Sequence, residues 1–187
     1  MELKERIIET TISNFNEKGL KFTMDDIANE LHISKKTLYK VFADKEAMFY
    51  EVVDYIFGNI KKSEREVVEN KNLGTLEKIR AILAVMPENY RGVDFRQMAV
   101  VMGKYPEIHA EVQKRLETGW EATLDLIDQG KKEGLIRKDV SNLLIKHIYE
   151  ASLEKFLMGD NLEAMGLTYT EGLERVVDVL LNGIAVK

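Results

Sequence analysis

The sequence predicts an all-α protein of about nine helices, with a small N-terminal domain over residues 1–47 and a larger one over residues 48–187. Apolar residues recur at the three- and four-residue spacing of a helix face, and no segment sustains the alternation of a half-buried strand. Only two of the 187 residues are proline. Residues 23–45 also contain two short amphipathic helix patterns separated by a brief interruption.

The first helix is expected over residues 3–18. Ile8, Ile12 and Phe15 lie three or four positions apart, so they face the same side and can be buried together. Gly19 follows, and a glycine directly after a helix can end it by adopting a left-handed conformation.

Thr23 is expected to begin the second helix as its N-cap, because Asp26 stands three positions later and completes the pattern of a capping box. This helix is short, about two turns. His32 and Ile33 interrupt it. Its inward face consists of four apolar residues, Met24, Ile27, Ala28 and Leu31.

Ser34 can cap a third helix. Its Leu38 and Phe42 are four residues apart and therefore face the core together. The residues left on the outer face are polar or basic: Lys35, Lys36, Thr37, Tyr39 and Lys40.

The two patterns have the form of a helix-turn-helix, whose second helix enters the major groove of DNA. Residues 32–45 contain four lysines and one acid, a local charge of +3, whereas residues 1–47 carry eight basic and nine acidic side chains. A local cluster is sufficient, because a few cations that displace counterions from the phosphates supply the affinity. The alternative interpretation is an ordinary solvated helix face beside a core.

This region resembles the N-terminal DNA-binding domain of the TetR family of bacterial repressors. The resemblance covers roughly residues 1–55. It rests on motifs in one order: Gly19, the run from Thr23 through Ala28, the run from Ser34 through Tyr39, Phe42, Asp44 to Glu46, and Met48. The remaining residues match only in helical character and length. The resemblance implies a dimer that binds double-stranded, palindromic operator DNA, and a C-terminal ligand-binding and dimerisation domain whose small-molecule effector changes operator affinity.

The side chains of this helix-turn-helix segment, residues 23–45, can be assigned to two kinds of DNA contact. Lys36 and Thr37, in the first turn of the third helix, are expected to reach base edges, with Lys35 close by. Hydroxyl and ammonium groups around them are expected to contact phosphates: Thr23, Ser34, Tyr39, Lys40 and Lys45. The alternative is a helical ligand-binding or interaction protein of the same fold that does not read DNA; acidic residues at the outward positions would have favoured it.

Two positions depart from the family pattern. His32 stands in the turn where glycine is common, and Val41 stands where a further aromatic residue or histidine is common. Histidine is among the residues enriched at positive φ, so we expect His32 to adopt the turn conformation at a modest energetic cost. Val41 removes a phosphate contact, which Lys40 can replace.

The fourth helix is expected to begin at Asp44 and to continue past Ile60. Its apolar stripe is too wide for one neighbour, so we expect it to pack on both domains. After a loop at residues 70–74, the pattern predicts helices at residues 76–86, 95–103 and 108–134. Pro87 and Pro106 stand at their boundaries, as helix-breaking residues should.

Two last helices, at residues 139–158 and 170–183, carry apolar residues on more than one face. They can complete the core of one chain, or they can pack against the same pair of a second chain. The resemblance favours the second arrangement, a homodimer through a four-helix bundle.

The resemblance also places an effector pocket among the C-terminal helices. Its ligand is expected to be largely apolar with one or two polar groups. Each residue considered for its lining can instead belong to the core. These candidates are Phe57, Tyr90, Phe95, Met98, Met102, Trp120, His147 and Tyr149.

Other protein classes find little support. The absence of cysteine excludes disulfides, thiolate metal sites and a cysteine nucleophile. The three histidines form no pattern typical of a catalytic triad, and no glycine-rich phosphate loop occurs. His147 precedes Glu150 and Glu154 on one helix face, but the order is not that of a di-iron site. We therefore expect neither enzyme activity nor a cofactor or metal.

The chain also lacks the features of a membrane or exported protein. No apolar run reaches about 18 residues. The N-terminus mixes charged and apolar residues where a signal peptide would be continuously apolar. We expect a cytoplasmic protein without membrane contact. The net charge of −5 is compatible with a small basic DNA-binding surface on an acidic body.

Overall fold

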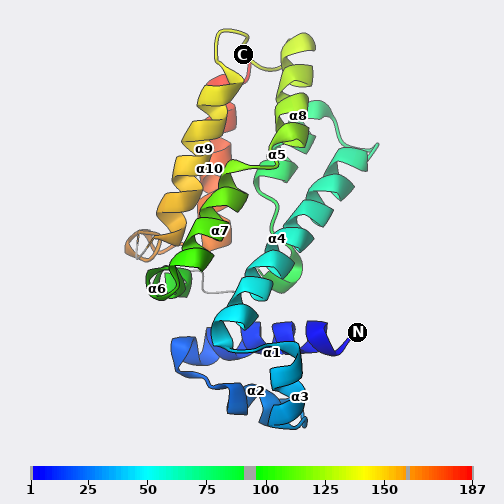
Figure 1. Cartoon of the computed structure of the whole chain (residues 1–187). Helices are drawn as coiled ribbons and strands as arrows, with labels where there is room; N and C mark the ends of the chain where they lie inside the picture. Colours follow the sequence, from blue (N-terminus) through cyan, green and yellow to red (C-terminus); the bar gives the residue numbers. More distant parts are fainter. Residues whose placement is uncertain (1, 91–95, 159–160, 187) are drawn as a thin grey trace.

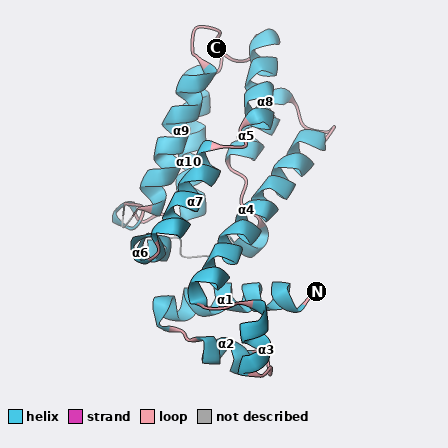
Figure 2. Cartoon of the chain, viewed as in Figure 1, coloured by secondary structure: helices cyan, strands magenta, loops and turns pink. Residues whose placement is uncertain are grey.

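The computed structural model describes residues 2–90, 96–158 and 161–186, and helices account for almost all of its regular structure (Figure 2). Within these residues lie ten α-helices, α1 to α10, and three single turns of 3-10 helix. One antiparallel bridge, between Ile136 and Ala185, is the only β-type pairing in the described part of the chain. The all-α fold predicted from the sequence is confirmed.

The first three helices are α1 (Leu3–Lys18), α2 (Met24–Glu30) and α3 (Lys35–Val41), and they lie together at one end of the molecule (Figure 1). Apolar side chains from all three helices form a shared core that excludes solvent. Ile7, Ile27 and Leu38, one from each helix, have no solvent exposure. The three helices therefore form one packed unit, as the sequence predicted.

Helix α4 (Lys45–Glu69) connects this unit to the rest of the molecule (Figure 1). It packs against α1 at one end and against α5 and α7 further along. Met48 and Phe49 are buried on the N-terminal side, and Val52, Val53 and Ile56 continue the buried face. The prediction that α4 contacts both domains is thus confirmed. The predicted domain boundary at residues 47 and 48 falls within its first turn.

Six helices form the C-terminal body: α5 (Thr75–Leu83), α6 (Arg96–Lys104), α7 (Pro106–Glu117), α8 (Glu121–Lys132), α9 (Asn142–Leu157) and α10 (Tyr169–Ile184). Helix α5 packs against α4, α8 and α10, while α9 packs against α6, α7, α8 and α10. The C-terminus lies at the end of the molecule opposite α2 and α3 (Figure 1).

The helix predicted over residues 108–134 is two helices, α7 and α8. Thr118 is extended and Gly119 has a φ of +74°, so the chain leaves the helix between Glu117 and Glu121. The apolar spacing continues across the break, which explains the incorrect prediction. Where α7 ends, a side chain replaces a missing backbone donor: Trp120 Nε1 donates to the carbonyl of Leu116 at 2.7 Å.

Two further boundaries differ from the predictions. Helix α5 ends at Leu83 and not at Pro87, although Met86 beyond it is buried. Helix α9 begins at Asn142 and not at residue 139, because the Ser141 hydroxyl accepts the Leu144 N–H at 3.1 Å and thereby caps the helix. None of the helices in the described ranges has the length and apolar character needed to cross a membrane.

Candidate DNA interface and internal cavity

The turn between α2 and α3 has the geometry of a helix-turn-helix. The Thr23 hydroxyl accepts the Asp26 N–H at 3.2 Å, and the Asp26 carboxylate accepts the Thr23 N–H at 2.7 Å, so the predicted capping box is present. His32 has a φ of +54°. This left-handed residue lets the chain reverse after α2, and the Ile33 N–H donates to the Ala28 carbonyl at 3.0 Å. The expectation of positive φ at His32 is confirmed.

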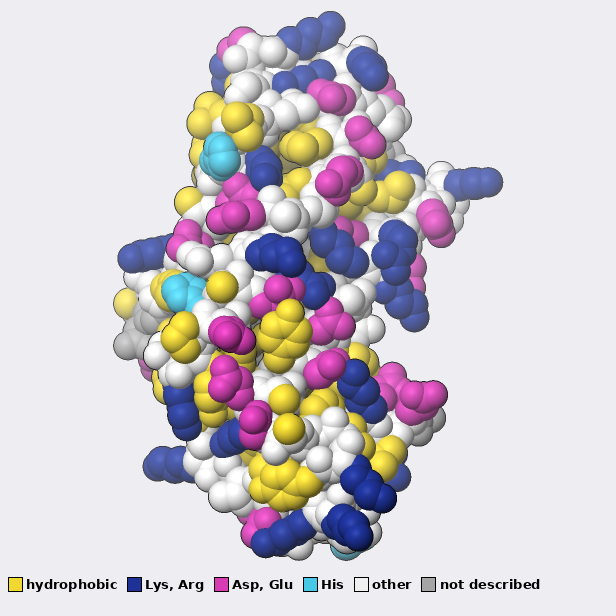
Figure 3. Space-filling model, viewed as in Figure 1, with side chains coloured by type: hydrophobic (Ala, Val, Ile, Leu, Met, Phe, Trp, Pro, Cys, Tyr) yellow, Lys and Arg dark blue, Asp and Glu magenta, His cyan; other side chains and the backbone are white. Residues whose placement is uncertain are grey.

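Helix α3 presents one face to the core and one to solvent. Ser34 caps it by accepting the Thr37 N–H at 3.0 Å, and Leu38 and Phe42 are buried. Lys36 and Lys40 are exposed, and neither forms an ion pair with another described residue. Tyr39 beside them is 49% exposed. The space-filling view shows Lys and Arg side chains gathered at this end of the molecule (Figure 3).

Lys35 lies on the same helix but has a partner. Its ammonium is 2.5 Å from the carboxylate of Asp25 on α2, and both side chains are largely exposed. The hydrogen bond with Asp25 raises the pKa of Lys35. Asp25 therefore compensates the charge of Lys35 in the structure.

Three of the hydroxyls expected to contact DNA also form hydrogen bonds at the N-terminal caps of α2 and α3. The Thr23 hydroxyl lies 2.8 Å from the Asp26 carboxylate within the capping box. Ser34 Oγ and Thr37 Oγ1 are 2.8 Å apart, in the first turn of α3. A hydroxyl can donate and accept, so these groups keep some capacity for DNA, but their first role is to cap α2 and α3.

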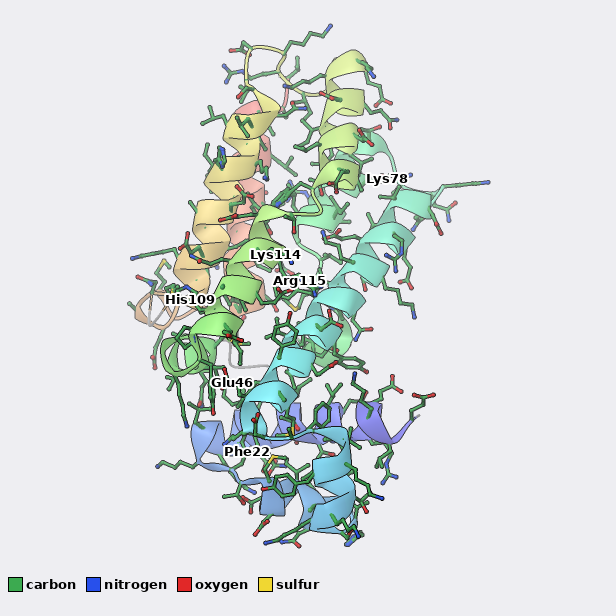
Figure 4. The ribbon with its side chains drawn as sticks, viewed as in Figure 1. Phe22, Glu46, Lys78, His109, Lys114 and Arg115 are labelled. Atoms are coloured by element: carbon green, nitrogen blue, oxygen red, sulfur yellow. The ribbon has the colours of Figure 1, made fainter. Side chains whose placement is uncertain are left out.

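Lys45, expected at a phosphate, lies differently from the other lysines of this set. Its ammonium turns inward, donating to the carbonyls of Leu20 at 2.8 Å and Phe22 at 2.5 Å. It also lies 3.7 Å from the centre of the Phe22 ring, which sits below the start of α4 (Figure 4). Burial, and then the charge of Lys104, lowers the pKa of Lys45. A phosphate contact would require this side chain to leave three internal partners.

The C-terminal body contains a largely apolar cavity of about 110 Å³, lined by residues of α4 to α10. An apolar cavity of this order can hold a small organic molecule, since one of about 150 Å³ binds benzene. Four of the candidates chosen from the sequence line it: Phe57, Met98, Trp120 and Tyr149. Trp120 and Tyr149 meet edge to face, with ring centres 5.9 Å apart.

Other candidates lie elsewhere. Tyr90 and Met102 are buried outside the cavity lining, and the Tyr90 hydroxyl accepts a hydrogen bond from Asn59 at 2.8 Å. His147 is on the exposed side of α9, where Nδ1 lies 2.9 Å from Glu150. These three residues do not line this cavity, since helical spacing does not tell which face meets it, and their part in ligand binding stays a prediction. Phe95 falls outside the described residues.

The sequence reasoning missed the charged residues of the cavity wall. Lys61 and Glu64 on α4 line it and form an ion pair at 2.8 Å. In a sequence, such a pair three residues apart is indistinguishable from a common solvent-exposed pair on a helix surface. Arg115 also lines the cavity and points from α7 toward α4 (Figure 4).

Potential metal ligands do not converge in the described part of the chain: no three histidine or carboxylate side chains are arranged to hold an ion. His147 Nδ1 and Glu150, considered above as ligands, lie 2.9 Å from each other. The two candidate functional sites in the described residues are therefore the exposed basic face of α3 and the apolar cavity in the C-terminal body.

A helix-turn-helix with a basic second helix, joined by one long helix to a helical body that holds a cavity, defines a class of DNA-binding transcriptional regulators. Comparison with known proteins gives the family. Residues 7–52 match the family described as bacterial regulatory proteins, tetR family. The uncharacterized HTH-type transcriptional regulator YvaF of Bacillus subtilis (strain 168) is 30% identical, over 97% of this chain and 95% of its own length. This chain belongs to the TetR family.

Solved structures agree in fold. The regulatory protein TetR from Rhodobacter sphaeroides superposes with a TM-score of 0.75 at 15% identity, covering 96% of this chain and 97% of its own. A TetR/AcrR-family regulator from Thermobifida fusca gives a TM-score of 0.70 at 23% identity, with 96% and 97% covered. The family consists of transcriptional regulators and not enzymes, as the sequence predicted.

Proposed function

We propose that this protein is a repressor that binds a palindromic operator as a homodimer and leaves it when a small, largely apolar molecule occupies the cavity. The observation that carries the DNA-binding part is the outward face of α3. Lys36 and Lys40 project from it without an ion-pair partner among the described residues, while Leu38 holds the opposite face in the core. Such free cations can displace counterions from phosphates.

The homodimer is supported by α9 and α10. In the monomer their outer surface carries large apolar side chains that remain exposed: Val179 is 75% exposed and Leu143 is 60% exposed. Leu144 and Ile148 continue this surface at 52% and 46%. An isologous pairing of these helices would bury it and would produce the two-fold symmetry that a palindrome requires. The two copies of α3 would then enter successive major grooves about 34 to 36 Å apart.

Release by a ligand is supported by the position of α4. The same helix supplies Phe57 and Lys61 to the cavity wall. Its Met48 and Phe49 belong to the core of the N-terminal unit, where they contact Thr11 and Phe15 of α1. A ligand that prefers one position of α4 shifts the equilibrium between DNA-binding and non-binding arrangements by its difference in affinity for the two.

The experiment is selection of fragments of the organism's own genome by the purified protein at moderate salt, followed by titration of a retained fragment. We expect a palindromic fragment. Lys36→Ala should lower affinity for it about 5- to 150-fold, while affinity for unrelated DNA changes much less. Lys62→Ala, an exposed lysine of α4 away from α3, is the matched control and should bind normally. Retention of no specific fragment, or equal binding by Lys36→Ala, would refute the proposal.

A further inference from the structure

The charged side chains in the described wall of the cavity are already paired. Lys61 Nζ lies 3.0 and 2.8 Å from the two carboxylate oxygens of Glu64 and donates to the carbonyl of Gly119 at 2.7 Å. The Glu64 side chain is only 14% exposed. Burial raises the pKa of Glu64, although Lys61 acts in the opposite direction. This pair is therefore a neutral unit set into an apolar wall.

Arg115, the remaining charged residue of that described wall, is neutralised too. Its guanidinium lies 2.6 Å from Glu111 on its own helix and 2.5 Å from Asp54 on α4. Two carboxylates thus face one guanidinium, so Arg115 offers no uncompensated positive charge to an incoming anion.

The polar atoms of the aromatic wall are occupied as well. Tyr149 donates its hydroxyl hydrogen to the Leu83 carbonyl, and Trp120 Nε1 donates to Leu116. By contrast, the Glu64 carboxylate keeps spare capacity. It accepts two hydrogen bonds from Lys61, whereas a carboxylate can accept about four. The three donors of the Lys61 ammonium are all in use, on the two Glu64 oxygens and the Gly119 carbonyl.

We propose, resting on the ligand response put forward above, that the ligand of this cavity is uncharged and mostly apolar, with one end group that donates a hydrogen bond to the Glu64 carboxylate of the Lys61–Glu64 pair. An amide or an alcohol has this chemistry. A charged ligand would lose its hydration on entering the cavity and would have to separate an existing ion pair to regain a partner. Aromatic walls attract cations, but the Lys61 ammonium already compensates the charge of the carboxylate that would hold one.

The test uses three probes with the same alkyl chain and different end groups: octanamide, octanoate and octylammonium, at neutral pH. Trp120 is the only tryptophan of the chain and lines the cavity, so its fluorescence reports binding directly. We expect octanamide to bind at least about tenfold more tightly than either charged probe. Equal or tighter binding of a charged probe would overturn the proposal, and so would failure of all three to bind up to their solubility.

Substitutions at Glu64 and Lys61 test where the end group of the probe binds. Glu64→Gln leaves the Lys61 ammonium without its countercharge, and should improve octanoate binding relative to octanamide by about tenfold or more. Lys61→Gln should shift the preference toward octylammonium in the same way, and is the second variant if the first fails to fold. Glu66→Gln removes an exposed carboxylate from the same helix and is the control. An unchanged ranking in a folded Glu64 or Lys61 variant would overturn the placement.

Gel shift with operator DNA separates this inference from the proposed function. If octanamide binds with the expected ranking and operator affinity stays the same, the ligand response fails while the ligand class stands. If a charged probe both binds more tightly and releases the operator, the response stands and the ligand class fails.

Discussion

At the scale of single residues, the DNA-facing surface is set by which lysines have internal partners. Asp25 holds Lys35 at 2.5 Å, so α3 presents Lys36 and Lys40 as free cations and Lys35 as a tethered one. An exposed pair of this kind is readily exchanged. Asp25 thereby limits binding to any DNA phosphate that Lys35 can reach.

We predict that Asp25→Asn increases affinity for unrelated DNA several-fold at low salt and makes the dependence of log K on log salt steeper by about one. The reason is that Lys35 becomes available to a phosphate. Titration of a random duplex at several salt concentrations measures both quantities. Glu17→Gln removes the same charge from an exposed site on α1 and is the control. An equal gain from both substitutions would assign the effect to net charge alone.

Lys45 illustrates the opposite case, a lysine whose charge serves the fold. Its ammonium satisfies the Leu20 and Phe22 carbonyls and joins the segment between α1 and α2 to the first turn of α4. Lys45→Met should therefore reduce stability by about 1 to 2 kcal/mol, which corresponds to a Tm lower by about 2 to 8 °C.

The salt slope of DNA binding distinguishes this role from a phosphate contact. Lys45→Met should leave the slope unchanged, whereas Lys40→Met should reduce it by about one without a comparable loss of Tm. Thermal unfolding and salt-dependent titration of both variants provide the measurements. A reduced slope in Lys45→Met at an unchanged Tm would restore the phosphate role first expected from the sequence.

At the scale of elements, α9 and α10 combine internal packing with an outer apolar surface. Ile145 and Tyr149 on α9 and Val177 on α10 are buried, while Val179 and Leu143 stand in solvent. Both helices therefore have more apolar surface than one chain can cover. This is the element-level reason for expecting a dimer.

Val179→Glu should convert the dimer to a monomer, because the interface would have to bury an unpaired carboxylate. In sedimentation, the mass should fall from twice 21.5 kDa to 21.5 kDa. The control is Val100→Glu, which places the same charge at an exposed valine of α6, and it should leave the mass unchanged. A dimer that persists in Val179→Glu would place the contact elsewhere on the surface.

At the scale of the whole molecule, two neighbouring cavities share residues. A smaller space between α1, α4 and α6 is lined by Phe15, Phe49, Ile56 and Met98, and the last two also line the large cavity. Helix α6 also meets the N-terminal unit directly. The end of the Gln97 side chain contacts Gly19, whose φ of +57° favours glycine. Helices α4 and α6 thus connect the large cavity to the N-terminal unit.

We predict a coupling between the two sites of about 1 to 3 kcal/mol, or about 5- to 150-fold in operator affinity. Linkage requires that operator DNA weaken ligand binding by the same factor. Titrating octanamide, followed by Trp120 fluorescence, with and without saturating operator measures it. Unrelated DNA of equal length is the control. A probe that releases the operator yet binds equally well with and without it would contradict the scheme.

The sequence by itself determined the local structure of the DNA-binding end. Capping residues such as Thr23 and Ser34, the apolar spacing that buries Leu38, and the positive φ at His32 all depend on interactions within a few residues. Local interactions of this kind can be read from a chain without knowing its tertiary neighbours.

Only the tertiary structure decided which side chains are free and which are engaged. Lys35 and Lys45 look alike in sequence, yet one meets Asp25 across the turn and the other meets carbonyls more than twenty residues away. The same holds for the cavity. In the sequence, Lys61 and Glu64 resemble a surface pair, whereas in the structure they line the cavity. Tyr90 resembles a lining residue, whereas in the structure it lies outside the lining and its hydroxyl accepts a hydrogen bond from Asn59. Contacts between distant segments depend on how the helices pack, and helical periodicity alone carries no information about that.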